Sequence, residues 1–208
     1  MPQFDLWIGG SEADEVWERL PTLPESQEGE IELRQFQAMA LNNQTEENIM
    51  GAKGEALAKQ FEAKAQEAAT VLEKLSDADW KKVTEAEKWS VGVTAHHLAG
   101  SYERVPDIAT GLAAGQSFGN FTRKILDERN AQHAKDFAGC TKEETLTLHR
   151  KGAAKAASVV RGFRDEQLEK RGILFTDAPP MTVEQLIMGA LIDHTDEHYG
   201  SIRKTVGK

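Results

Sequence analysis

The chain is poor in cysteine and has no long hydrophobic run. Cys140 is the only cysteine among 208 residues, so no disulfide can form within the chain, as is usual in a reducing cytoplasm. A membrane-spanning helix needs about 20 consecutive apolar residues, and no stretch approaches that length. The N-terminus lacks the basic start and apolar core of a secretory signal. We therefore expect a cytoplasmic protein with no membrane partner.

Positive charge is also in short supply. Lysine and arginine number 25 against 34 aspartates and glutamates, which gives a net charge of −9. An acidic surface repels the phosphates of nucleic acids and of anionic lipids. We therefore expect a small-molecule substrate rather than a nucleic acid. Hydrophobic residues make up 39% of the chain, enough to build the core of one domain.

Apolar residues recur at helical spacing through most of the chain. From about Thr45, apolar residues repeat at steps of three and four, which is the period of one helix face; they are Leu57, Phe61, Ala65, Ala68, Leu72 and Leu75. A second helix starts after Ser90, a good N-cap, and Pro106 should kink or shorten it. Further helices are expected over 121–137 and from the Thr141 capping box to about Phe163.

No segment alternates with the two-residue period of a strand. Long amphipathic segments joined by loops are typical of an antiparallel four-helix bundle, an all-α fold. We assign residues 46–208 to this bundle and residues 1–45 to an N-terminal appendage of unclear structure. Alanine-rich stripes on the first and third helices also allow a homodimer.

Two histidines lie on the apolar face of the last predicted helix, Val183–Val206. His194 and His198 are four residues apart, so their rings lie one turn apart on the same face. Two imidazoles at this spacing can bind one divalent metal but leave its coordination incomplete. Histidines at this spacing are also common without a metal, so a third ligand is needed to support a metal site.

His97 is the best candidate for the third ligand. It lies on an inward strip of the second helix with Val93 and Ser101. Its neighbour His96 points about 100° away, so we expect one of the two to face inward and the other outward. The alternative is that both are surface or capping groups.

Two segments, WSVGVTAHHLAG and HTDEHYGSIRKTVG, resemble the DinB-like superfamily of metalloenzymes, over about residues 48–207. The resemblance implies a four-helix bundle in which the histidine of a Trp-Ser-x(5)-His-Leu segment joins an HxxxH pair on the last helix. Trp89 and Ser90 match the start of the first motif. His97, His194 and His198 are then the implied metal ligands.

Three imidazoles would leave a divalent ion with an open position, which is typical of catalytic sites. Imidazole suits zinc, nickel and iron alike, so the sequence does not choose among them. The resemblance implies a thiol-dependent S-transferase that uses a low-molecular-weight thiol such as bacillithiol or mycothiol. Two alternatives are a metal-dependent hydrolase and a non-catalytic metal- or ligand-binding bundle. HTDEH is not HExxH, which disfavours a zincin-type protease.

Other residues are weaker candidates, each with an ordinary structural explanation. Asn130 and Tyr102 could contact a ligand, His149 could be functional or a core residue, and Cys140 near a helix N-terminus could have a lowered pKa. Acidic residues beside the HxxxH motif could orient an imidazole, although solvent exposure is the simpler expectation; they are Asp193, Asp196 and Glu197.

Overall fold

The computed structural model describes residues 34–36, 39, 51–116 and 118–207. The chain divides into two compact units, Met1–Glu46 and Glu47–Lys208. In the first unit, the described residues 34–36 and 39 are helical. The rest of the predicted appendage and the predicted helix start at Thr45 lie outside the described residues, so the appendage remains a prediction.

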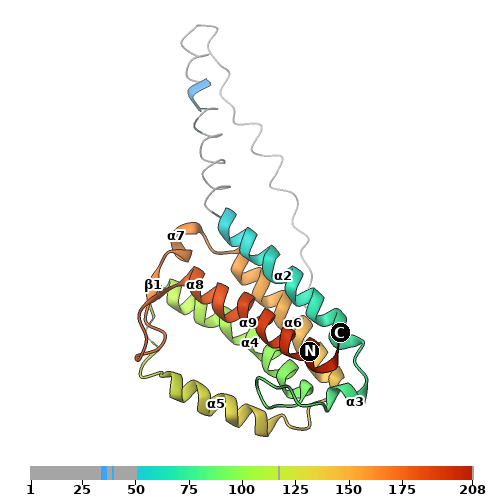
Figure 1. Ribbon diagram of the computed structural model, residues 1–208. Coiled ribbons are helices and arrows are strands. Elements are labelled where there is room, and N and C mark those ends of the chain that lie inside the picture. The colour runs from blue at the N-terminus through green and yellow to red at the C-terminus, as the bar shows by residue number, and fades with distance from the viewer. Residues whose placement is uncertain (1–33, 37–38, 40–50, 117, 208) are drawn as a thin grey trace, which may run out of the picture. The chain divides into compact units, whose positions relative to one another are not determined.

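Four helical runs form the bundle of the second unit (Figure 1). They are α2 (Ala52–Glu73), α4 (Val91–Ala113), α6 (Lys142–Arg161) and a C-terminal run of α8 (Val183–Ile187), a π-helix (Met188–Asp193) and α9 (His194–Val206). Helix α6 packs against both α2 and α4, and α4 also packs against α9. The predicted all-α bundle is confirmed.

Shorter elements connect and cover these helices: α3 (Asp77–Trp80), α5 (Arg123–Asp136), α7 (Asp165–Leu168), β1 (Arg171–Gly172) and β2 (Met181–Thr182). Helix α5 contacts α4 outside the four main runs (Figure 1). Strands β1 and β2 pair antiparallel. Sequence patterns did not indicate these strands, because a strand of two residues cannot display a period. Within the described residues, no helix is both long and apolar enough to cross a membrane.

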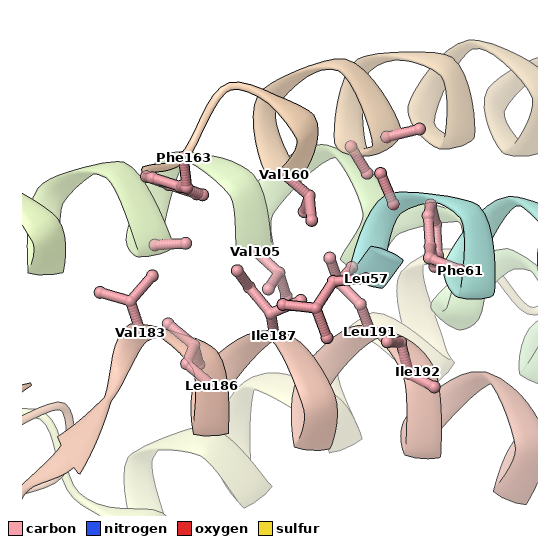
Figure 2. Packing of buried hydrophobic residues seen from close by; sticks show 14 of the residues in the cluster. Leu57, Phe61, Val105, Val160, Phe163, Val183, Leu186, Ile187, Leu191 and Ile192 are labelled. Carbon is pink, nitrogen blue, oxygen red and sulfur yellow. The ribbon is translucent and has the colours of Figure 1, made fainter. Parts of the chain in front are cut away.

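The core is built from one apolar stripe on each helical run. Figure 2 shows Leu57 and Phe61 of α2, Val160 of α6, and Ile187 and Leu191 of the C-terminal run pointing into a common interior. The apolar positions predicted on the first helix are all buried. Complete burial of a valine, leucine, isoleucine or phenylalanine side chain contributes about 1.5–3 kcal/mol. These stripes therefore supply the main driving force for bundle formation.

Small residues let α2 and α6 approach closely. A Cβ on Gly54 would lie 2.6 Å from the backbone oxygen of Phe163. Ala65 of α2 and Ala156 of α6 are buried in the same cluster. The alanine stripes that suggested a homodimer are thus used, at least in part, inside a single chain. The homodimer itself remains a prediction.

Pro106 does not shorten the second helix, because α4 runs through it to Ala113. A proline inside a helix removes one N–H donor and typically costs about 3 kcal/mol. Here Pro106 is buried, and its neighbours Val105 and Ala109 belong to the core. We infer that this packing outweighs the local cost. Of the two effects expected from the sequence, the shortening of the helix is wrong, and the kink remains a prediction.

Candidate metal centre

Three histidine side chains from two helices converge. The Nε2 atom of His194 lies 3.3 Å from Nε2 of His97 and 2.9 Å from Nε2 of His198. Each of the three histidines offers one nitrogen, and these atoms all lie within 4.8 Å of one another. Zinc–nitrogen bonds of about 2.0–2.1 Å place two ligands of a tetrahedral ion about 3.3 Å apart. The separations are therefore close to those of ligands that share one ion.

The segment around Trp89 and Ser90 places His97. The Ser90 hydroxyl accepts a hydrogen bond from the backbone N–H of Val93 at 3.2 Å, which caps α4 at its first turn. The Trp89 ring lies edge-on to the His97 imidazole, with 5.3 Å between ring centroids. The Trp-Ser pair therefore starts the helix and supports the histidine two turns later.

The π-helix Met188–Asp193 sets the rotation of the other two histidines. The prediction of one continuous α-helix is wrong here, because π-turns hold more residues per turn than α-turns and shift every later side chain around the axis. After this shift, Thr195 and Tyr199 are buried in α9. His194 and His198 lie at the edge of that buried stripe, partly exposed. Helical periodicity alone does not reveal such a shift.

Burial keeps two of these imidazoles neutral. It lowers the pKa of His97 to about 2, with further lowering by the neighbouring histidines. It lowers the pKa of His194 to about 3, and the charge that His198 would carry acts in the same direction. Both groups are therefore unprotonated near neutral pH, the form in which imidazole binds metals.

Glu87 orients His198. Its carboxylate accepts a hydrogen bond from Nδ1 of His198 at 2.8 Å and another from the Ser201 hydroxyl at 2.7 Å. Burial raises the pKa of Glu87, but hydrogen bonds from Ser201, Thr84 and His198 together bring it below its usual value. An ionised carboxylate on Nδ1 leaves the Nε2 lone pair of His198 facing the cluster. The neighbouring Lys88 has φ 61°, a left-handed conformation that is uncommon outside glycine.

The sequence interpretation missed Glu87 and looked for an orienting carboxylate beside the HxxxH motif instead. Asp193, Asp196 and Glu197 are all exposed, and Asp196 pairs with Lys64. A signal for Glu87 was available in its position two residues before Trp89, but no periodicity points to it.

The donor set fits a divalent cation. Three Nε2 atoms at these separations cannot all carry a proton, because the hydrogens would collide. If none carries a proton, the three lone pairs point at one another and repel. His97 and His194 also have buried Nδ1 atoms without a hydrogen-bond partner among the described residues. A cation bound by all three Nε2 atoms would turn the repulsion into coordination, which is the chemistry for which neutral imidazoles are suited.

His96 is not part of the cluster, yet it is buried as well. Its Nδ1 atom lies 3.3 Å from Nε2 of His133 in α5, and its ring stacks on Phe137 with 3.9 Å between centroids. The expectation that one of His96 and His97 faces outward was therefore wrong, because α5 covers this side of α4. Burial, with a contribution from His96, lowers the pKa of His133 to about 4. No sequence motif pointed to His133.

A cavity of about 370 Å³ opens beside His97 and His194. This is within the range of small-molecule sites, about 300–1,000 Å³. Its walls come from α4, α5, the C-terminal run and the loop after β1, and are mostly apolar. Asn130, a weaker sequence candidate, lines this cavity. No aspartate or glutamate of the described residues does.

The remaining candidates lie elsewhere. The Tyr102 hydroxyl is 3.0 Å from the Thr195 hydroxyl inside the core, so it does not serve the cavity. His149 is 1% exposed, packs against Tyr102 and has no hydrogen-bond partner among the described residues. Burial raises the pKa of Cys140, contrary to the lowering that its place near a helix start suggested.

The bundle with its histidine cluster defines the class of protein, and comparison with known families agrees. A model of the DinB superfamily matches residues 60–202, a range that contains all three histidines and Glu87. The chain belongs to this superfamily. No curated protein matches the chain, and no solved structure does.

Proposed function

We propose that this protein is a metal-dependent enzyme in which His97, His194 and His198 hold one divalent ion of zinc, nickel or iron. The observation that carries the proposal is the convergence of three Nε2 atoms beside a cavity large enough for a small-molecule substrate. Structural zinc sites are usually closed by four protein ligands. Three ligands next to a cavity favour a catalytic site over a purely structural one.

The reaction that we propose is thiol-dependent S-transfer. When bound, a divalent ion supplies a Lewis acid that favours the ionised form of a thiol. The thiol gives up its proton to the solvent, its sulfur bonds to the electrophilic carbon of the second substrate, and the leaving group departs with the electrons of the broken bond. His97 and His194 face the cavity, Glu87 holds His198 in place, and the apolar walls exclude water. Low-molecular-weight thiols are kept reduced in the cytoplasm, the proposed location.

The cavity walls favour transfer over hydrolysis. A hydrolase benefits from a base that can accept a proton from water. None of the described carboxylates lines this cavity, and the imidazole of His133, which does, lies 3.3 Å from Nδ1 of His96 through its Nε2 atom. Glu87 is engaged by His198 and Ser201. A purely metal-binding role would leave the cavity without a use.

The test is turnover by the metal-loaded protein with a panel of low-molecular-weight thiols and an aromatic halide as the electrophile. We expect thioether product that requires both the thiol and the metal and is lost in His97→Ala. His149→Leu, which changes a buried histidine outside the cluster, should retain activity. Hydrolysis of an ester panel without thiol would favour the hydrolase instead, and absence of both reactions would contradict an enzyme.

A further inference from the structure

Arg104 is a cation on the wall of the cavity that forms no ion pair with any described carboxylate. Its chain neighbour Glu103 acts on it through space only and is itself paired with Lys151. Arg104 lies on the same side of α4 as His97 and Ser101, and all three line the cavity. It makes no hydrogen bond or ion pair with any described residue. By contrast, Arg150 and Arg161 pair with carboxylates on the outer surface of the bundle. The positive charge of Arg104 is therefore free to meet a ligand.

Gly100 provides the space for this guanidinium. A Cβ on Gly100 would lie 3.0 Å from Nη1 of Arg104 and 3.6 Å from Cζ. The side chain thus folds back along α4 over the glycine, one turn before its own position. This places the guanidinium near the histidines. Burial is the largest cause that lowers the pKa of His97 and His194, and the charge of Arg104 lowers both pKa values further.

Helix α5 contributes a second arginine to the cavity wall. Arg129 of α5 also lines the cavity, with its guanidinium 4.9 Å from the centre of the Phe121 ring. No described carboxylate pairs with it. The apolar part of the lining includes Leu126, Leu174 and Phe175, and the uncharged polar part includes Ser101, Asn130 and His133.

Among the described residues, the cavity lining therefore combines two arginines, no carboxylate and a mostly apolar surface. A divalent ion at the three histidines would add more positive charge. Such a site is complementary to an anion, because a negative group would offset this charge in a partly desolvated place. A guanidinium presents two parallel N–H donors, which match a carboxylate better than a single-point anion.

We propose that the cavity binds a carboxylate-bearing molecule with an apolar body, its carboxylate on Arg104 and its body against Leu126, Leu174 and Phe175. This proposal rests on the proposed function, because it takes the cavity to be the substrate site, and it adds the chemical class of the substrate. The carboxylate belongs either to the thiol or to the electrophile. Arg129 contributes long-range attraction at the rim.

Calorimetry with octanoate and its neutral analogue octanamide tests the proposal on the full-length chain. The metal is first removed with a chelator, so that the carboxylate cannot gain affinity by binding the ion. We expect octanoate to bind at least about tenfold more tightly than octanamide, as a charge-assisted bidentate contact allows. Arg104→Gln should abolish this preference while octanamide binding stays unchanged. Arg150→Gln, which removes a paired surface arginine, should retain the preference.

Two more variants separate the contact from general charge. Arg104→Lys keeps the charge without the fork and should retain only part of the preference. Gly100→Ala keeps Arg104 but displaces its guanidinium, so this variant should bind octanoate more weakly and octanamide as tightly as before. Equal binding of octanoate and octanamide, no binding of octanoate at millimolar concentration, or a preference that survives Arg104→Gln would overturn the proposal.

The source of the carboxylate is found in the transfer assay. Thiols and electrophiles are compared in pairs that carry the carboxylate on one partner only, and Arg104→Gln should raise KM for that partner. Loss of transfer with octanoate preference intact would contradict the proposed function and not this inference. Transfer by a protein without the preference would contradict this inference alone.

Discussion

Glu87 accepts a hydrogen bond from Nδ1 of His198 across 2.8 Å, although 111 positions separate the two residues in the chain. The contact joins the loop before α4 to the last helix. It orients one of the three imidazoles that we assign as metal ligands. The carboxylate is held in turn by Ser201, so the support for the site extends beyond the histidines.

The first prediction concerns this support. Glu87→Gln replaces an anionic acceptor by a neutral amide, which is a weaker partner for Nδ1–H. We expect metal affinity to fall about 10- to 100-fold, the usual effect of losing such a partner, measured by competition with a chromogenic chelator. Glu85→Gln is the matched control, because Glu85 is exposed and pairs with Lys204 on the surface. Equal affinity in both variants would contradict the role of Glu87.

The second prediction concerns the close packing of α2 on α6. A Cβ at Gly54 would meet the backbone oxygens of Phe163 and Val160 at 2.6 and 2.8 Å, and backbone cannot move aside as a flexible side chain can. We expect Gly54→Ala to lower the free energy of unfolding by about 1–3 kcal/mol. Gly200→Ala in α9 meets no atom within 4 Å and should raise it by about 0.5–1 kcal/mol.

Urea denaturation measures the free energy of unfolding of the two alanine variants and of the wild type. If Gly54→Ala were as stable as Gly200→Ala, the two helices would lie farther apart than described.

The third prediction is a dependence of stability on pH through His149. Burial lowers its pKa in the folded protein to about 4, against about 6.5 in an unfolded chain. Between these values the unfolded chain binds a proton that the folded protein does not. The free energy of unfolding should therefore fall as pH drops from 6.5 to 4, by up to about 3 kcal/mol from this residue.

His149→Leu removes this contribution and also two buried nitrogens that lack partners among the described residues. Urea denaturation of metal-free protein at pH 7 and at pH 5 measures how the free energy of unfolding changes with pH in the wild type and in the variant. The variant should match or exceed the wild type at pH 7 and lose less stability at pH 5. The same loss in both proteins would show that His149 is not the group responsible.

Much of the fold could be predicted because it rests on local patterns. The stripe from Leu57 to Leu72 predicted α2, and Ser90 and Thr141 marked helix starts that the structure confirms. The HxxxH spacing and the Trp-Ser motif pointed to three histidines that the structure brings together.

What could not be predicted depends on contacts between distant segments. Glu87 belongs to a loop without periodicity, and its partner His198 is known only once α9 lies beside that loop. His96 is buried because α5 covers it, which the sequence of α4 does not encode. The π-helix before His194 preserves apolar contacts on both sides, so hydrophobic spacing does not distinguish it from an α-helix.

The metal content of untagged protein, measured by mass spectrometry, decides whether the three histidines bind an ion. We predict about one divalent ion per chain in the wild type and in the control variant His149→Leu, and loss of the ion in His97→Ala and in His198→Ala. Absence of metal from the wild type even after reconstitution would rule out the three-histidine metal site. Retention of a full equivalent in both His97→Ala and His198→Ala would contradict it equally.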